Sequence, residues 1–157
     1  MRKRSRSREF ALQVLYQMEI NRSDLVDVLE DFWKDRSDLI LSNTEKEAIE
    51  QDKKDPEIRE YTEKLVKGAR EKLESIDKTI ERFAEHWAIG RMAYVDRNIL
   101  RLSAYEMLFL EDIPIKVAIN EAVELAKRYG ESDSSKFVNG ILDRIAKTEC
   151  HREPSPP

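Results

Sequence analysis

The sequence contains one cysteine, Cys150, and only four glycines among its 157 residues. A single cysteine cannot form an internal disulfide and is typical of a reducing compartment, so we expect a cytoplasmic protein. No apolar run reaches the roughly 20 residues that a membrane-spanning helix needs, and the basic start lacks the apolar core of a signal peptide. Scarce glycine with 38% charged residues favours a helical protein over a β-sandwich.

Patterns of common catalytic sites are also missing. The two histidines are His86 and His151, and His151 adjoins Cys150 without further metal-ligand spacing. The chain has no glycine-rich phosphate loop and no nucleophile elbow. Acidic pairs such as Glu121 and Glu124 are ordinary on helix surfaces. We therefore expect no enzyme, no cofactor and no metal site.

Residues 113–143 show two helical patterns joined by a short polar turn. Asp112 is a candidate cap for the first helix, Pro114 suits its first turn, and Gly130 is predicted to end it in the left-handed conformation. Ser132 or Asp133 then caps the second helix. The periodic apolar residues of that second helix are Phe137, Ile141, Leu142 and Ile145.

The pair Asn139-Gly140 interrupts this second helical pattern. Asn-Gly is usually a turn signal, and glycine inside a helix costs about 1 kcal/mol relative to alanine. Two interpretations are open. Either close helix packing leaves no room for a side chain at Gly140, or Lys136, Phe137 and Asn139 form an exposed contact patch that needs this geometry.

The rest of the chain predicts further helices. Ala11, Val14, Leu15 and Met18 form one core stripe. A second helical pattern covers 25–33, and a third begins at Pro56 after the cap Asp55. A fourth runs from Ser75 with Ile76, Ile80, Phe83 and Trp87 in line, and a fifth opens at Tyr94 or Asp96. The polar segment 43–54 is expected to be a connection with one helical turn.

Together these patterns predict an all-α protein of about seven helices in two packed subdomains. We expect one domain over 1–148. It comprises a basic arm (1–8), an N-terminal helical subdomain (about 9–74) and a C-terminal one (about 75–148), followed by a disordered tail at 149–157.

Positive charge is concentrated at the start of the chain. The basic residues of the arm are Arg2, Lys3, Arg4, Arg6 and Arg8. They carry +5, so the remaining 149 residues carry −9, because the net charge is −4. An acidic body repels phosphate, so nucleic-acid binding must be local to this arm and to neighbouring patches.

A helix that extended back into the arm would place Arg2, Arg6, Gln13 and Tyr16 on one side, because their spacings are helical. Guanidinium groups, an amide and an aromatic ring suit single-stranded RNA, whose phosphates need cations and whose unpaired bases stack and form hydrogen bonds. The alternative is a solvated arm that only aids solubility.

Three segments carry a family resemblance: REFALQVLY at 8–16, DRNILR at 96–101 followed by AYE at 104–106, and DIPIKVAINEAVELAK with SSKFVNGILD at 112–143. In this order they resemble the bacterial transcription antitermination factor NusB family. The resemblance covers about 4–145 and implies the same all-helical fold. It also implies a protein that binds boxA-type single-stranded RNA of ribosomal RNA operons together with ribosomal protein NusE.

By this resemblance the protein loads on the RNA polymerase elongation complex with other Nus factors and supports read-through of terminators. The arginine-rich start is implied to hold RNA, as are positions near Asp133, Lys136, Phe137 and Asn139, although Phe137 is equally consistent with the core. The candidates for the NusE-binding face are Asp96, Arg97, Arg101 and Tyr105. An ion pair within the protein is the alternative for Arg97 and Arg101.

Other functions stay open at this point. One is an RNA-guiding domain that acts with a separate ribosomal RNA methyltransferase, because NusB-like domains also occur fused to such enzymes. Another is a protein scaffold without RNA binding. A second copy of the chain is a further candidate partner.

Overall fold

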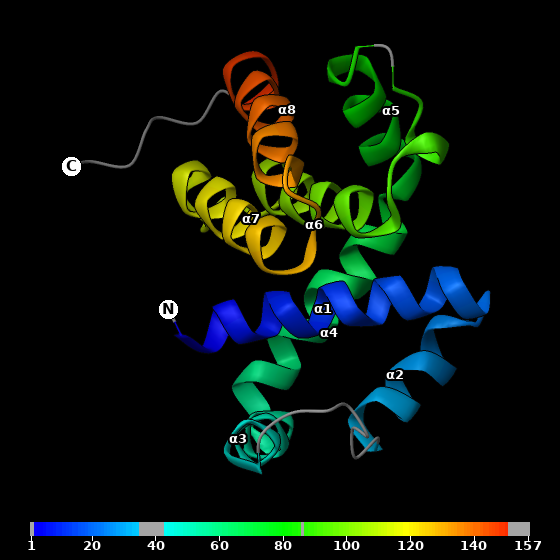
Figure 1. Cartoon of the computed structure of the whole chain (residues 1–157), viewed down its shortest axis with the longest axis vertical. Helices are drawn as coiled ribbons and strands as arrows, with labels where there is room; N and C mark the ends of the chain where they lie inside the picture. Colours follow the sequence, from blue (N-terminus) through cyan, green and yellow to red (C-terminus); the bar gives the residue numbers. More distant parts are fainter. Residues whose placement is uncertain (1, 35–42, 86, 151–157) are drawn as a thin grey trace. The chain divides into compact units, whose positions relative to one another are not determined.

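A computed structural model describes residues 2–34, 43–85 and 87–150 of the protein (Figure 1). These residues form eight α-helices and one short 3-10 helix: α1 (Arg2–Asn21), α2 (Leu25–Lys34), α3 (Asn43–Lys54), α4 (Pro56–Glu71), α5 (Leu73–Phe83), η1 (Ile89–Arg91), α6 (Tyr94–Phe109), α7 (Ile115–Tyr129) and α8 (Ser134–Glu149). The expected all-α fold is confirmed. None of the described helices is long and apolar enough to cross a membrane.

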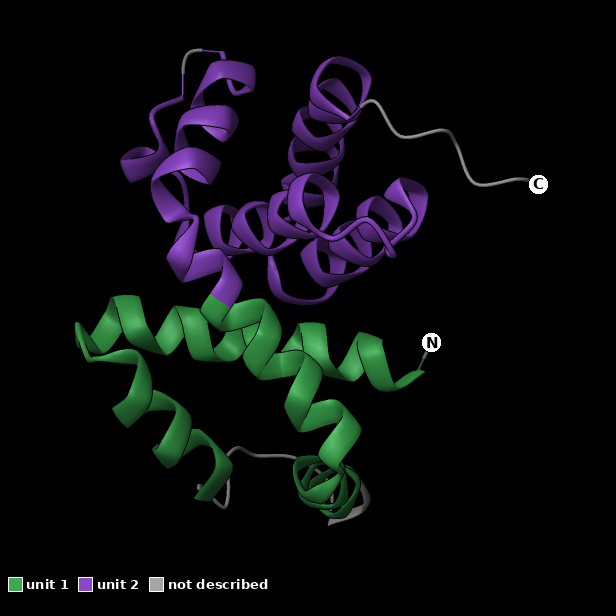
Figure 2. Cartoon of the chain, turned by 180° about the vertical axis from the view of Figure 1, so that it is seen from behind, with its two compact units in different colours: residues 1–67 green, residues 68–157 purple. Residues whose placement is uncertain are grey.

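One prediction falls largely outside the described residues: the disordered tail at 149–157, of which only Glu149 and Cys150 are described. The chain divides into two compact units, residues 1–67 and 68–157 (Figure 2). Unit 1 holds α1, α2, α3 and most of α4, and unit 2 holds the remaining helices.

An aromatic cluster joins α1 to α2 in unit 1. The rings of Phe10, Phe32 and Trp33 meet edge to face, with centroids 5.2 Å, 6.0 Å and 5.0 Å apart. Such pairs contribute about 0.5–1.5 kcal/mol each beyond the burial of their area. A buried hydrogen bond joins α1 to α4, since the Ser7 hydroxyl donates to the carbonyl of Ile58 at 2.8 Å. The start of α1 is therefore fixed against its neighbours.

The prediction for 43–54 was wrong, because this polar segment is the helix α3. Its attachment to α2 is made by a charged side chain instead of an apolar stripe. The Lys53 ammonium donates to the Phe32 carbonyl at 3.0 Å and lies 4.3 Å from the centre of the Phe32 ring. A search for apolar periodicity cannot detect a helix that is held in this way.

In unit 2, α6 packs against α5, α7 and α8. The buried apolar residues of α6 lie on several sides of the helix, as its central position requires: Ile99, Leu100, Leu102, Ala104 and Met107. The hairpin of α7 and α8 covers it, and buried residues of α8 complete this core at Val138, Ile141, Leu142 and Ile145. The predicted apolar face of the last helix is thus confirmed in all but Phe137, which is only half-buried.

The turn between α7 and α8 requires glycine for a different reason from the predicted one. Gly130 is extended, with φ −94° and ψ −175°, so the prediction of a left-handed residue was wrong. A Cβ at Gly130 would lie 2.5 Å from the Cβ of Ser134. Ser134 is held in that place because its hydroxyl accepts a hydrogen bond from the Glu131 N–H at 2.9 Å. Close approach, not a positive φ, therefore selects glycine here.

The end of α5 also differs from expectation. The apolar line was predicted to continue through Trp87, but α5 ends at Phe83. Glu85 has a φ of 50°, a left-handed conformation that directs the chain away from the helix axis. Trp87 consequently leaves the core and is 53% exposed.

Gly68 offers a test of packing in unit 2. A Cβ at Gly68 would lie 2.0 Å from Cζ of Tyr105, whose ring is only 9% exposed and stacks on Phe109. We expect Gly68→Ala to lower the free energy of unfolding by on the order of 2 kcal/mol, because overpacking outweighs the better helix propensity of alanine.

The matched control is Gly90→Ala, since a Cβ at Gly90 meets none of the described residues within 4 Å. Urea denaturation of both variants measures the difference. Equal stability of the two variants would show that Tyr105 moves aside at little cost.

Candidate nucleic-acid interface

The basic arm is part of a helix, because α1 begins at Arg2. Its basic side chains differ widely in exposure: 67% for Arg2, 46% for Lys3 and 19% for Arg6. Arg4 is exposed, whereas the whole Arg8 residue is 3% exposed. The helix therefore extends back through the arm, as the predicted RNA-binding side requires. The first turn of this helix is its most accessible part.

Two of the arginines converge on one carboxylate of α3. Arg2 donates to both oxygens of Asp52, at 3.2 Å and 3.3 Å, and Nε of Arg6 donates to Oδ2 of Asp52 at 2.8 Å. Asp52 is only 6% exposed. Arg6 also pairs with Glu9 at 3.3 Å, one turn along α1. Asp52 therefore fixes the direction of two guanidinium groups and attaches α3 to α1.

Lys3 makes a second contact of the same kind. Its ammonium lies 3.1 Å from Oδ2 of Asp55 and 3.4 Å from Oε2 of Glu57. Asp55 caps α4, as predicted, since its Oδ1 accepts the Glu57 N–H at 2.9 Å. The hydrogen bond from Lys3 lowers the pKa of the Asp55 carboxyl, and the bonds to Asp55 and Glu57 raise the pKa of Lys3.

Arg4 and Arg8 lie against an aromatic ring of α4. The guanidinium carbons of Arg4 and Arg8 are 4.7 Å and 5.8 Å from the centre of the Tyr61 ring. Arg4 keeps its exposed edge, so it can still reach a phosphate. The prediction that Arg8 binds RNA does not fit its burial, because a phosphate cannot reach a residue that is 3% exposed.

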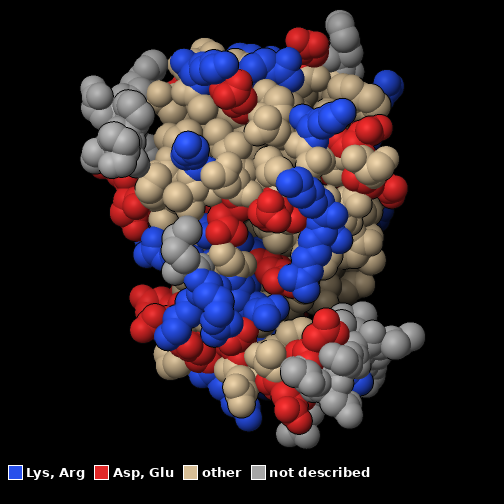
Figure 3. Space-filling view, turned by 60° about the vertical axis from the view of Figure 1, so that its left-hand side comes forward, with Lys and Arg blue, Asp and Glu red and all other residues tan. Residues whose placement is uncertain are grey.

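The surface that results is mixed in charge. Figure 3 shows basic and acidic side chains interspersed on the face it displays, instead of one continuous basic surface. Farther along α1, Gln13 is half-buried and Tyr16 is 40% exposed. The tyrosine ring is thus available for stacking, as predicted from its position on a polar side.

The predicted contact patch on α8 consists of Asp133, Lys136, Phe137 and Asn139; we call it the α8 patch. All but Phe137 are exposed, and Asp133 stands at the N-cap position without a capping hydrogen bond from its side chain. The half-buried ring of Phe137 meets the ring of Trp87 edge to face, with centroids 6.3 Å apart. One edge of Phe137 is therefore packed and the rest borders the surface.

The structure excludes one of the two interpretations of Gly140. Among the described residues, and apart from the backbone of α8 itself, the one neighbour within 4 Å of a Cβ placed there is Nη2 of Arg144, at 3.9 Å. The interpretation that close helix packing excludes a side chain at Gly140 was wrong, because this side of α8 has room for one. The exposed contact patch remains the prediction for this position.

The candidates for a partner-binding face lie on α6. Arg101 makes two hydrogen bonds to Asp77 of α5, at 2.9 Å and 3.0 Å, so it takes part in the ion pair that was its alternative. The Arg97 guanidinium lies 4.2 Å from the centre of the Tyr94 ring, which is 42% exposed. Arg97 and Tyr94 therefore present a surface that a partner can reach.

Asp96 and Tyr105 differ in what they can offer. Asp96 is half-buried, and its Oδ1 has no hydrogen-bond partner among the described residues. Tyr105 does not fit the predicted partner-binding role, because its ring packs against Gly68 inside unit 2. Burial, followed by the charge of Glu71, raises the pKa of Tyr105.

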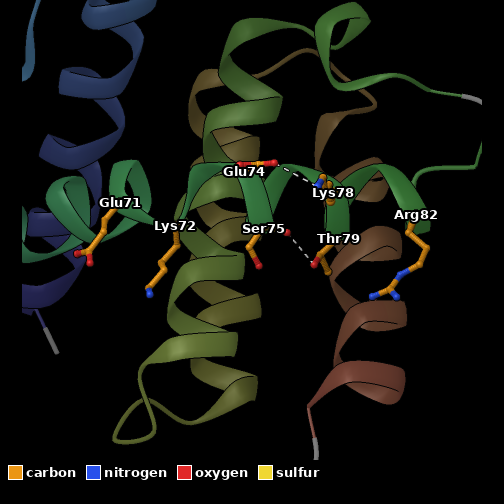
Figure 4. Close-up of a pocket in the computed structure, with 7 residues that line it drawn as sticks. All are labelled: Glu71, Lys72, Glu74, Ser75, Lys78, Thr79 and Arg82. Carbon is orange, nitrogen blue, oxygen red and sulfur yellow. Dashed lines mark hydrogen bonds and ion pairs between the residues drawn. The ribbon is translucent and has the colours of Figure 1, made fainter.

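A hollow of about 580 Å³ lies along α5 and contains none of the predicted site residues (Figure 4). Its lining residues are Glu71, Lys72, Glu74, Ser75, Lys78, Thr79 and Arg82. Lys78 pairs with Glu74 at 3.2 Å, and the Thr79 hydroxyl donates to the Ser75 carbonyl at 3.0 Å. Within 2–34, 43–85 and 87–150, no three His, Cys, Asp or Glu side chains are grouped so as to hold a metal ion.

Comparison with known proteins identifies the family of this chain. The model of the NusB family matches residues 5–147, which is nearly the whole chain. The chain belongs to the NusB family. Transcription antitermination protein NusB of Thermodesulfovibrio yellowstonii is 41% identical over 160 residues, covering 96% of this chain and 97% of that relative.

Solved NusB structures share the fold. Thermotoga maritima NusB aligns with a TM-score of 0.75 at 42% identity, covering 98% of this chain and 93% of the other. A crystal structure of antitermination factors NusB and NusE in complex with double-stranded RNA aligns with a TM-score of 0.75 at 31% identity, covering 94% and 98%. The NusB family identified from sequence motifs is therefore confirmed.

Sequence reasoning missed two residues beside the predicted interface of this NusB-family protein. Asp52 lies in a helix that was not expected, and Trp87 was assigned to the core. Only the chain geometry brings Asp52 to Arg6 and Trp87 to Phe137, since each pair is about 50 residues apart in sequence. The one available signal was the unusual polarity of residues 43–54. A segment this polar does not suit a core, but it can pair with a basic arm.

The pairing of Asp52 with Arg2 and Arg6 leads to a prediction about the stability of the protein. Asp52→Asn keeps the size of the side chain but removes the charge that Arg2 and Arg6 share. Hydrogen bonds to charged groups contribute about 1.5–3 kcal/mol, so we expect the free energy of unfolding to fall by about 1–3 kcal/mol in urea denaturation. Glu50→Gln is the matched control, because Glu50 is exposed on the same helix. A loss no larger than that of the control would mean that Asp52 does not hold the arm.

The Asp55 carboxyl leads to a prediction about how the stability of the protein depends on pH. Its pKa is lowered in the folded protein, so its contribution to stability is present above the ordinary pKa of about 4 and is lost as the pH falls through the lowered value. Asn caps helices as well as Asp does, so Asp55→Asn removes only the charge. We expect the stability of this variant to fall less between about pH 4 and pH 2 than that of the wild type, measured by urea denaturation at each pH. Parallel pH profiles would contradict the role of the Lys3 pair.

Proposed function

We propose that this protein is a transcription antitermination factor that binds boxA-type single-stranded RNA of ribosomal RNA operons together with ribosomal protein NusE. The observation that carries the proposal is membership of the NusB family over residues 5–147. A relative with 41% identity is named for transcription antitermination, and an aligned structure contains NusB, NusE and RNA.

The chain offers two RNA-binding patches, one on each unit. In unit 1, Arg2, Lys3, Arg4 and Arg6 supply cations, while Gln13 and Tyr16 supply an amide and a ring. In unit 2, the α8 patch supplies Lys136, Phe137 and Asn139. Exposed rings suit unpaired bases, which is why we expect single-stranded RNA to be the natural ligand.

The mechanism is adhesion, with no bond made or broken. Phosphates are held by the exposed cations, and bases are selected by stacking and by hydrogen bonds to their edges. Asp96 and Arg97 remain the proposed surface for NusE, whereas Arg101 is bound to Asp77 within the protein. The complex then joins the RNA polymerase elongation complex with other Nus factors, and supports read-through of terminators in the bacterial cytoplasm.

The first test is fluorescence anisotropy of a labelled boxA-like RNA, against a scrambled strand and a duplex of the same sequence, at several salt concentrations with and without NusE. We expect selective binding that tightens with NusE and weakens with salt. Replacing Arg2, Lys3 and Arg4 with Gln should reduce the slope of log K against log salt by about 2, since each phosphate contact on a single strand contributes about 0.7.

The matched control replaces Lys34, Lys64 and Lys67, three exposed lysines of unit 1 outside the arm. It should leave the salt slope unchanged. Equal or absent binding to the boxA-like and scrambled strands, even with NusE present, would overturn the proposal. Intact NusE binding without any RNA affinity would instead favour a protein scaffold.

A further inference from the structure

Neither the conformation nor the packing of α8 requires a glycine at position 140. It lies within α8, where glycine is destabilising relative to alanine. In the part of the chain that the structure describes, no neighbour prevents a side chain there, because the nearest atom to an added Cβ outside the helix backbone is the flexible end of Arg144 at 3.9 Å. The backbone of α8 is thus left bare on a half-exposed side, which gives an external ligand a close approach.

An exposed aromatic ring stands beside this bare segment. Trp87 is 53% exposed and contacts Phe137 edge to face, at 77° between ring planes. Phe137 precedes Gly140 by three residues, so both lie on one side of α8. The edge contact fixes the tryptophan through one side of its ring system and leaves much of its surface uncovered. A large apolar surface in this state is a platform on which a flat group can stack.

The charged groups around Trp87 and Gly140 are of both signs. Lys136 is exposed and forms no ion pair within the described parts of the chain. Arg144 pairs with Glu85 at 3.2 Å, in a bridge whose side chains are 45% and 68% exposed. Asp133 is the other acidic residue of the patch. An exposed bridge of this kind is weak, so the Arg144 guanidinium can turn to a phosphate.

We propose that Trp87, Phe137 and Gly140 form a subsite for one unpaired nucleotide of the RNA. The base stacks on Trp87, and the sugar and phosphate lie along α8 in the space above Gly140, within reach of Lys136 and Arg144. This inference rests on the proposed RNA-binding function and adds two residues to it. A flat ring, a bare backbone and two exposed cations match a nucleotide, which joins a flat base to an anion.

Gly140→Ala separates binding from folding, because alanine is the better helix former and meets no obstacle. We expect this variant to melt at the same temperature as the wild type or higher, and to bind the boxA-like RNA at least about 5-fold more weakly. Thr148→Ala is the control, since it also improves the helix propensity of α8 at an exposed position away from the subsite. It should leave the RNA affinity unchanged.

Trp87 supplies an independent readout. Trp87→Ala should weaken RNA binding by about 5- to 150-fold, the range found when a stacking ring is removed. Trp87→Phe should recover most of that loss, because it keeps a ring. RNA should quench the tryptophan fluorescence of the wild type, and the quenching should disappear in Trp87→Phe. Tyr94→Ala, measured without NusE, is the control for an exposed ring of unit 2 outside the subsite.

The outcomes distinguish the subsite from the wider function. If Gly140→Ala and Trp87→Ala bind RNA as the wild type does, while the arm variant is weakened, the subsite is wrong and the proposed function stands. If these variants lose affinity for NusE alone, the surface binds protein and the subsite is again wrong. If the wild type shows no preference for the boxA-like RNA, the proposed function fails and the subsite fails with it.

Discussion

The contact between Asp52 and the two arginines of α1 is the constraint on which unit 1 depends. Without it, the first turns of α1 would carry like charges along one side, and α3 would lack one of its two described polar attachments. With it, the guanidinium groups are held in a known direction before any ligand arrives. A ligand then loses less side-chain freedom on binding, which improves affinity without new contacts. The Asp52 carboxylate also competes with phosphate for the two arginines. The arrangement therefore favours a ligand whose shape fits the fixed guanidinium groups over one that offers negative charge alone.

An acidic protein can bind RNA only where its charge is arranged locally, and the two patches proposed for RNA differ in their chemistry. In unit 1 the cations are docked and paired, so exposure selects among them: Arg2, Lys3 and Arg4 are accessible, whereas Arg8 is buried. In unit 2 the α8 patch has fewer charges, and its half-buried Phe137 lies against the ring of Trp87, which is 53% exposed. Exposed cations are thus the main feature of the first patch, and aromatic rings are the main feature of the second.

Helices with an apolar stripe could be predicted from the sequence, because burial leaves a regular pattern. This holds for α4 with its Asp55 cap and for α7 and α8. It failed for α3, whose attachments are polar, and at Trp87, where a left-handed residue ends a line of apolar positions that looks continuous. The basic residues were evident, but their exposure was not, since it depends on Tyr61 and Asp52, which lie far along the chain. A pattern in sequence reports the character of a surface, and only the fold reports what covers it.

The contact between Gly68 and Tyr105 has a consequence for the history of the family. Because the phenol ring occupies the space where a Cβ would stand, neither position is free to change alone. A larger residue at 68 becomes acceptable only after the residue at 105 has become smaller, and a smaller residue at 105 leaves a void that only a larger residue at 68 can fill. Aligned relatives should therefore show the two positions changing as a pair, with glycine accompanying the aromatic ring.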